Sequence, residues 1–296
     1  MNMRQKILLS LINCAGGKIS RLRLVKLAFL LAQEYNLKQI NTFYQFVPYR
    51  YGPFSFTLYH EIQSLIKKGI IITPSEHELQ IPAYLDLCLE EELERAVKLL
   101  WYHYGKLELS KLVKIVYTNY PWFTAKSEHN TKRVNLLPTT ENAIYTAGYE
   151  GLQVDGFLNL ILKTGIQKLI DVRRNPVSRR YGFHKTTLSR ICQYLGVEYI
   201  HVPELGIPSA WRTNLCSSFD YEQLFARYQQ EILLNQESSI KNIASWVTSK
   251  PSVLVCYEAN PNYCHRSRLA KLVSNITGLK VRDLGGAELE RDIYED

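Results

Sequence analysis

VLVCYEANPNYCHRSRLAKLV, residues 253–273, is the stretch that decides the fold. The apolar run Val253 to Cys256 has the length of a buried strand, and the Pro and Asn residues of 259–263 mark a loop. Apolar residues then recur at helical spacing from Leu269. In an open α/β sheet, such a crossing brings side chains to the carboxyl ends of the strands, where ligands bind. We therefore expect an α/β domain whose site includes this loop.

Four side chains of the stretch would meet at the start of its helix. Glu258, Cys264, His265 and Arg266 bring a carboxylate, a thiol, an imidazole and a guanidinium to a helix N-terminus, whose free N–H groups and dipole favour an anion. This combination suits a phosphate or a developing oxyanion. The alternative is a structural loop in which Arg266 and Glu258 only pair with each other.

The chemistry of these residues allows several assignments. Cys264 at a helix start beside His265 would have a stabilised thiolate and could act as a nucleophile, although a small buried thiol is also common. We prefer Asp171 or Glu258 as the acid or base, with arginines holding the anion. Cys256 and Cys264 with His265 could supply metal ligands, but neither a fourth ligand nor a CxxC pair accompanies them. No metal and no cofactor is therefore assigned.

The residues before this stretch alternate between strand and helix patterns. Short apolar strands are expected at 143–148, 168–173 and 197–202, with helices between them that end on Gly165 and Gly196. This alternation predicts a mostly parallel sheet with helices on its faces.

The same sheet edge should then collect further polar residues. Tyr149 follows the first strand, and Asp171 and Arg173 end the second. Arg179, Arg180 and Lys185 follow in a segment rich in basic residues. Arginines can hold a phosphate by bidentate contacts, and Tyr149 could stack on an exposed base, so nucleic acid is the natural ligand class. Ordinary packing is the alternative for each of the 20 tyrosines taken singly.

Composition sets the broad class of the protein. A length of 296 residues and an apolar fraction of 46% predict two domains with real cores. The net charge of +8 permits a polyanionic partner, and most of the basic excess lies in residues 1–140. Six cysteines without framework spacing, and no secretory signal, predict reduced thiols and a cytoplasmic protein. No apolar run is long enough to span a membrane.

The N-terminal half has a helical character. Helical patterns lie at 4–13, 21–31 and 58–66, and 70–73 with 78–81 could form a hairpin, which together suggest a winged-helix-like arrangement. Arg21, Arg23 and Lys26 are left for solvent or a partner. A DNA-reading third helix would present the following residues to the major groove: Thr57, His60, Glu61, Ser64 and Lys68. Because this face is barely basic, a module that binds protein is at least as well supported.

The organisation expected from these patterns is a helical winged-helix-like domain at 1–128, a linker at 129–141 and an α/β domain at 142–296. Residues 128–140 are polar and lack periodicity, which is typical of a linker.

Two family resemblances add to this interpretation. The first is loose, spans roughly residues 5 to 128 and concerns the family called domain of unknown function 4065, or Panacea. It is carried by Arg50-Tyr51-Gly52-Pro53-Phe54-Ser55, Leu58-Tyr59, the 65–69 stretch, Val116, Pro121-Trp122 and Ala125. This resemblance implies a partner-binding module seen in antitoxins and genome-conflict proteins.

The second resemblance covers about residues 143–285 and concerns the family called domain of unknown function 488. It is carried by residues 146–151, Asp171-Val172-Arg173 with Pro176, Ser178-Arg179, Phe183 and Lys185, residues 196–199, residues 205–208 with Arg212, Cys256-Tyr257-Glu258 and Cys264-His265-Arg266. His184 stands where a small residue is commoner. The resemblance implies an α/β domain often linked to DNA repair or to defence against foreign DNA such as phage, and it adds Arg212 to the candidates for anion binding.

These observations lead to one functional hypothesis and one rival. The hypothesis is a hydrolase acting on nucleic acid, DNA rather than RNA, with a base- or backbone-directed site of glycosylase or nuclease type. The rival is a non-catalytic antitoxin- or defence-type protein that senses a nucleotide or modified base. A protein partner of the N-terminal domain fits both hypotheses.

Overall fold

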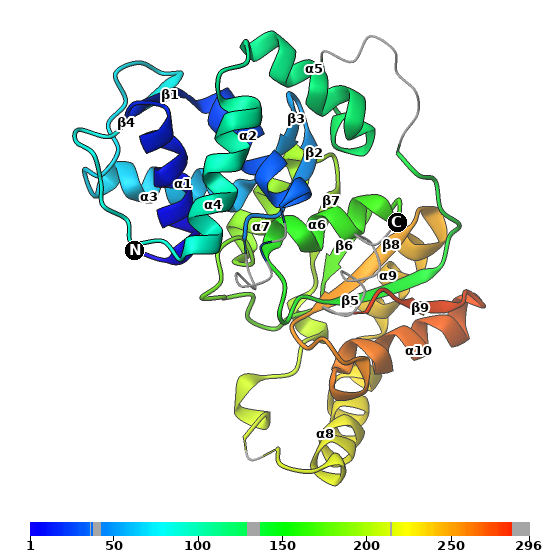
Figure 1. Ribbon diagram of the computed structural model, residues 1–296. Helices are drawn as coiled ribbons and strands as arrows, with labels where there is room; N and C mark the ends of the chain where they lie inside the picture. Colours follow the sequence, from blue (N-terminus) through cyan, green and yellow to red (C-terminus); the bar gives the residue numbers. More distant parts are fainter. Residues whose placement is uncertain (36, 38–42, 129–136, 214, 286–296) are drawn as a thin grey trace. The chain divides into compact units, whose positions relative to one another are not determined.

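The computed structural model describes residues 1–35, 37, 43–128, 137–213 and 215–285 (Figure 1). The chain divides into two compact units, Met1–Leu136 and Leu137–Asp296. Most of the expected linker, residues 129–136, lies outside the described part. No helix among the described residues is both long and apolar enough to cross a membrane.

The N-terminal unit is mainly helical. Its helices are α1 (Met3–Cys14), α2 (Arg21–Glu34), α3 (Phe56–Lys67), α4 (Glu91–Leu100) and α5 (Leu109–Asn119), with a π-helical turn at Trp101–Gly105 and a 3-10 turn at Pro121–Thr124. Side chains of Asn2, Ser20 and Ser55 cap the first three helices by accepting backbone N–H groups. The apolar faces of α1 and α2 meet in a core that also takes in α3 and α4.

Two pairs of short strands accompany these helices. β1 (Lys18–Ser20) pairs antiparallel with β4 (Glu78–Gln80), and β2 (Val47–Tyr49) pairs antiparallel with β3 (Gly52–Phe54). The expected hairpin of 70–73 with 78–81 is reduced to one bridge, between Ile72 and Gln80. β4 instead takes β1 as its main partner.

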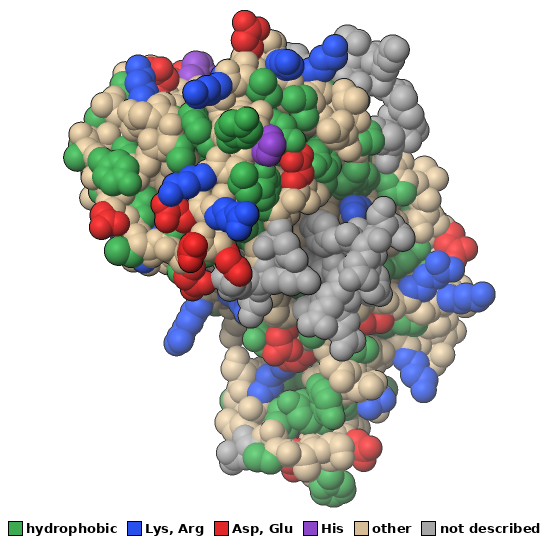
Figure 2. Space-filling model, in the orientation of Figure 1, with side chains coloured by type: hydrophobic (Ala, Val, Ile, Leu, Met, Phe, Trp, Pro, Cys, Tyr) green, Lys and Arg blue, Asp and Glu red, His purple; other side chains and the backbone are tan. Residues whose placement is uncertain are grey.

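Three of the expected surface positions of this unit are buried. Lys26 is fully buried, its Nζ donates to the carbonyl oxygen of Tyr51 at 2.5 Å, and burial lowers its pKa to about 7. Thr57 and Glu61 of α3 are also buried, and Glu61 pairs with Arg4. On the visible face of this unit, basic and acidic side chains are interspersed rather than gathered in one patch (Figure 2).

The C-terminal unit contains a five-stranded parallel sheet. Its strands are β5 (Ile144–Gly148), β6 (Lys168–Asp171), β7 (Glu198–His201), β8 (Ser252–Cys256) and β9 (Val281–Asp283), in the order β7-β6-β8-β5-β9. The expected α/β class is confirmed, whereas β9 had no strand signal in the sequence analysis.

Helices cover both faces of this sheet. α8 (Ser218–Glu231), α9 (Glu237–Ser249) and α10 (His265–Thr277) pack on the face that carries Ile170 and Leu254. Side chains alternate along a strand, so Leu169 and Val253 point to the opposite face, on the side of α6 (Val154–Lys163) and α7 (Lys185–Tyr194) (Figure 1).

This topology positions the site. The connection after β6 leads outward to β7, whereas the connection after the neighbouring β8 leads in the opposite direction, past β5 to β9. The carboxyl ends of two adjacent strands whose connections diverge form a crevice, which is where open α/β sheets bind ligands.

Candidate functional site

A pocket of about 290 Å³ opens at this crevice, at the carboxyl ends of β5, β6 and β8. Six of the predicted site residues line it: Tyr149, Arg173, Arg179, Arg212, Glu258 and His265. The rest of the lining is Arg174, Asn175, Val177, Ser178, Ile207, Ser209, Cys256 and Tyr257. The other predicted residues, which are Asp171, Arg180, Lys185, Cys264 and Arg266, lie outside this lining.

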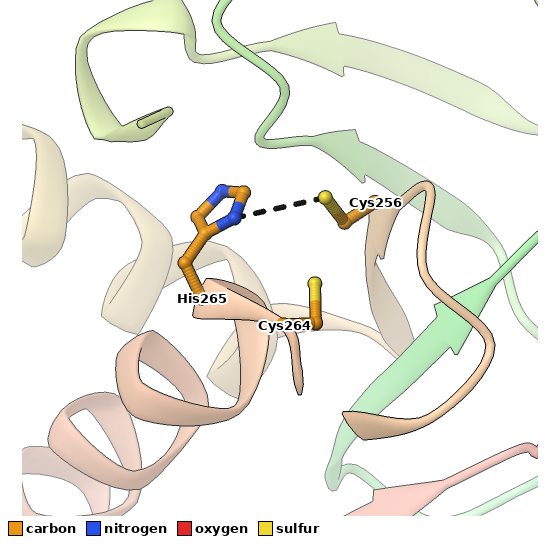
Figure 3. Close-up of side chains that lie close together, drawn as sticks. All are labelled: Cys256, Cys264 and His265. Carbon is orange, nitrogen blue, oxygen red and sulfur yellow. Dashed lines mark hydrogen bonds between the residues drawn. The ribbon is translucent and has the colours of Figure 1, made fainter. Parts of the chain in front are cut away.

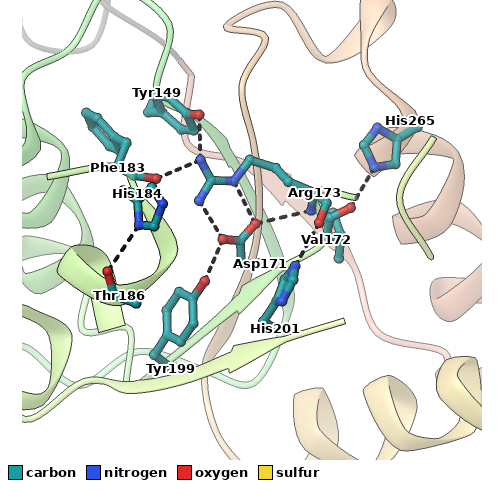
Figure 4. Close-up of polar contacts among 10 residues, drawn as sticks. All are labelled: Tyr149, Asp171, Val172, Arg173, Phe183, His184, Thr186, Tyr199, His201 and His265. Atoms are coloured by element: carbon teal, nitrogen blue, oxygen red, sulfur yellow. Dashed lines mark hydrogen bonds and ion pairs between the residues drawn. The ribbon is translucent and has the colours of Figure 1, made fainter. Parts of the chain in front are cut away.

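Asp171 is fully buried and does not line the pocket, and its carboxylate is held by Arg173 and Tyr199 (Figure 4). Its carboxylate accepts from Arg173 at 2.8 Å (Nε) and 2.6 Å (Nη2), and from the hydroxyl of Tyr199 at 2.7 Å. The side chain has no exposed surface. The expectation that Asp171 acts as an acid or base is therefore corrected, because a bound molecule could not reach a carboxylate enclosed in this way.

Arg173 shares this network and is held rigidly by it. Its Nη1 donates to the Tyr149 hydroxyl at 2.6 Å and to the Phe183 carbonyl at 2.9 Å (Figure 4). Burial tends to lower the pKa of Arg173, but the bonds and charge of Asp171 outweigh it and raise the pKa. Tyr149 stacks on Phe183, with ring centroids 4.0 Å apart. Asp171 thus positions Arg173 and Tyr149 at one wall of the pocket.

Glu258 lies at the pocket floor in an ion pair with Arg212. Burial alone would raise the pKa of this carboxyl, but the Arg212 charge and the hydrogen bonds from nearby thiols lower it to about 2. The alternative of a Glu258–Arg266 pair is not found, because the partner of Glu258 is Arg212. A carboxylate that stays ionised at neutral pH cannot act as a general acid, and it is a weak base.

His265 is buried at the same floor, and its two nitrogens have different partners. Nε2 lies 3.0 Å from the carbonyl oxygen of Val172, which can only accept, so Nε2 carries the hydrogen. Nδ1 lies 3.1 Å from Arg212 Nη2 and 3.7 Å from the thiol of Cys256, both of which are donors. The geometry therefore fits a neutral imidazole whose Nδ1 lone pair accepts from Arg212.

Cys264 and Arg266 are buried and do not line the pocket, although Cys264 lies directly beside Cys256 and His265 of the pocket floor. Burial raises the pKa of the Cys264 thiol well above its usual value, so the expected activation of a thiolate is not found. Arg266 donates to the carbonyl oxygens of Glu258 and Ala259 and pairs with Asp283 at 3.3 Å. Its expected role in holding an anion is corrected, because the guanidinium is buried and its hydrogen bonds hold the turn after β8.

The end of β5 approaches that turn closely. A Cβ at Gly148 would overlap the backbone carbonyl of Glu258. Only glycine therefore allows β5 and the turn after β8 to close around the pocket floor.

The basic residues of the 173–185 segment divide into two groups. Arg174 and Arg179 are exposed and line the pocket. Arg180 is also exposed, but its Nη1 donates to the Leu152 carbonyl at 3.0 Å, and Lys185 begins α7 outside the lining. The sequence analysis did not assign a site role to Arg174, although its place directly after the strand-end Arg173 is a signal that could have found it.

Three side chains at the pocket floor have the composition of a metal site. The ligand atoms of Cys256, Cys264 and His265 all lie within 4.8 Å of one another (Figure 3). Cys256 ends β8, Cys264 is the N-cap of α10 and His265 is its first residue, so the loop 257–263 brings the three side chains together.

Comparison with known proteins gives one match, to the C-terminal unit. No curated protein and no solved structure matches the chain. The resemblance of the N-terminal unit to the family called domain of unknown function 4065 stays a prediction. Residues 153–273 match the model of the family described as Domain of unknown function DUF488, which confirms the resemblance of the C-terminal domain to this family.

Proposed function

We propose that the protein is a cytoplasmic nucleic-acid-binding protein whose C-terminal pocket takes a phosphate of DNA. The observation that carries this proposal is the pocket at the carboxyl ends of β5, β6 and β8, whose lining includes the exposed Arg174 and Arg179. Exposed guanidinium groups at such a crevice can bind a phosphate bidentately.

An aromatic side chain beside the arginines supports a nucleotide rather than a simple anion. Tyr257 lines the pocket and remains 44% exposed. Its ring lies edge-on to Tyr149, with centroids 5.5 Å apart at 81°. An exposed ring next to a phosphate site can stack on a base, and such stacking tolerates different base sequences.

Sensing of a nucleotide or modified base is the activity that this arrangement supports best. Asp171 is enclosed and Glu258 is paired and ionised, so neither carboxylate is set up to move a proton. Hydrolysis of nucleic acid is the second candidate. In that reaction an ionised Glu258 would serve as a fixed negative charge opposite a cation-like sugar centre.

For the N-terminal unit we propose a protein partner. Two of the five positions on α3 that would face a DNA groove, Thr57 and Glu61, are buried in the unit itself. The interspersed charges of its visible face also differ from the basic stripe that DNA readers present (Figure 2).

The test is a titration of the full chain with fluorescently labelled single- and double-stranded DNA and RNA, followed by anisotropy at several salt concentrations. Arg179→Ala should weaken binding and reduce the slope of log K against log salt by about 0.7 to 0.9, the value of one phosphate contact. Arg190→Ala is the matched control, because Arg190 is exposed on α7 but lies outside the pocket lining.

Two results would decide against the proposal. One is the absence of binding to every probe at low salt, and the other is an equal effect of Arg179→Ala and Arg190→Ala. Analysis of the same labelled probes after incubation separates the two activities, since hydrolysis yields shortened or base-free strands and sensing leaves them intact.

A further inference from the structure

We propose that Cys256, Cys264 and His265 bind a Zn²⁺ ion, with Glu258 as the fourth ligand. The three nitrogen and sulfur donors converge at the pocket floor, and their side chains point toward one another (Figure 3). Two thiolates and an imidazole form a ligand set that favours zinc among the common divalent metals.

The separations of the donor atoms fit a tetrahedral ion. With typical zinc bond lengths, a sulfur and a nitrogen ligand lie about 3.6 Å apart and two sulfurs about 3.8 Å apart. Cys256 Sγ lies 3.7 Å from His265 Nδ1, and all three donors are within 4.8 Å. Cys256, Cys264 and His265 can therefore reach one ion by small side-chain adjustments. The Glu258 carboxylate lies outside this group and turns toward it on binding, and Arg212 moves aside.

Glu258 supplies the ligand that the sequence pattern lacked. Its Oε2 lies 3.1 Å from Cys256 Sγ, on the side of the cluster that faces the pocket. A carboxylate oxygen is an established zinc ligand, and its separation from a sulfur ligand would be about 3.5 Å. The spacing in sequence did not reveal it, because Glu258 reaches the cluster from the turn between the two cysteines.

His265 is oriented as a metal ligand would be. Its Nε2–H donates to the Val172 carbonyl at 3.0 Å, which directs the lone pair of Nδ1 toward the two sulfurs. Metal-bound histidines commonly use such a bond to a backbone carbonyl to fix the ring and its tautomer. The residue is 1% exposed, so this orientation is also held by packing.

The charges around the cluster balance with the metal bound. Binding replaces the two thiol protons by one divalent cation, so two protons leave and the net charge of the cluster is unchanged. Glu258 and Arg212 carry opposite charges and form an ion pair before the metal binds. Zn²⁺ at Nδ1 displaces Arg212 Nη2, now 3.1 Å away, and the 29%-exposed Arg212 side chain can turn into the pocket.

The first test uses the parent protein. Protein prepared with a reductant and zinc, and then freed of loose metal, should contain about one Zn²⁺ per chain by mass spectrometry of the metal. After removal of zinc by chelation, added Co²⁺ should produce the ligand-field absorption of a tetrahedral ion and a thiolate-to-cobalt charge-transfer band. Absence of bound zinc together with absence of the charge-transfer band would overturn the proposal.

The second test assigns the ligands. Cys256→Ser and Cys264→Ser should each lose part of the charge-transfer intensity and weaken zinc binding by about 10-fold or more. Cys192→Ser is the matched control, because Cys192 is a fully buried thiol on α7 outside the cluster. An equal loss in Cys192→Ser would place the metal elsewhere and overturn the assignment. The parent spectra decide the matter even if a variant fails to fold, and no readout depends on nucleic acid.

Discussion

Replacement of the buried amine of Lys26 by methionine should stabilise the N-terminal unit at pH 7. Lys26 is fully buried on α2, and no ion pair with a described residue compensates its charge. Burial lowers its pKa from 10.5 to about 7, and each pKa unit corresponds to about 1.4 kcal/mol. Burial of this amine therefore lowers the free energy of unfolding by on the order of 4 kcal/mol near neutral pH.

Methionine avoids this cost but loses one hydrogen bond. The Nζ group donates to the Tyr51 carbonyl, and an unmet buried acceptor costs about 1 to 3 kcal/mol. The net effect expected for Lys26→Met at pH 7 is therefore a gain on the order of 2 kcal/mol.

The pH dependence has a definite sign. Between pH 7 and 10.5 the unfolded chain binds more protons at Lys26 than the folded chain, so the free energy of unfolding should rise with pH in this window. Below pH 7 both states carry the proton, and this contribution is flat. Lys26→Met should abolish the rise.

Urea unfolding followed by circular dichroism from pH 6 to pH 10 measures both effects. Two units can unfold separately, so the transition that responds to Lys26→Met identifies the N-terminal unit. Lys114→Met is the control, because Lys114 is exposed on α5 and its replacement should change stability by less than about 0.5 kcal/mol. Parallel pH profiles of the parent and Lys26→Met would refute the reasoning.

Three substitutions test the architecture beneath the pocket. Asp171→Asn leaves the Arg173 charge buried without its counter-ion and should lower the free energy of unfolding by about 3 to 5 kcal/mol, measured by thermal unfolding. A decrease below about 1 kcal/mol would contradict the burial of the pair. Tyr199→Phe removes only one hydrogen bond to Asp171 and should lower the free energy of unfolding by about 1 kcal/mol in the same assay. An effect as large as that of Asp171→Asn would contradict the view that the Arg173 charge is the main partner of Asp171. Gly148→Ala forces a methyl group against the Glu258 carbonyl and should cost about 1 to 3 kcal/mol or more in urea unfolding, whereas an unchanged midpoint would show that the strand end can move.

The sheet could be predicted because its strands are apolar runs between turn residues. Residues 252–256 and 168–171 form β8 and β6, close to the expected ranges, and α10 begins at His265 as its spacing indicated. The short β9, Val281–Asp283, has no buried residue and carries no apolar run, so no pattern marked it. Its place in the sheet follows from its backbone pairing with β5.

The site was harder to predict because its contacts join distant parts of the chain. The sheet topology explains why Glu258 and His265 meet at one pocket. The arginine that pairs with Glu258 is Arg212, and its position depends on the segment around Trp211 rather than on the sheet. The enclosure of Asp171 depends on Tyr199 of another strand, and local sequence gives no signal for it. Burial of a charged group is likewise a tertiary property, which is why Lys26 was expected at the surface.

The strand order has a consequence for synthesis of the chain on the ribosome. β8 lies between β6 and β5 in the sheet, although it is translated long after both. Until β8 emerges, β6 can pair with β7, but β5 has no native partner strand, and the open edges of β5 and β6 can recruit other chains. The domain must therefore fold late in translation, and a polypeptide truncated before residue 252 should be a target for chaperones rather than a smaller stable domain.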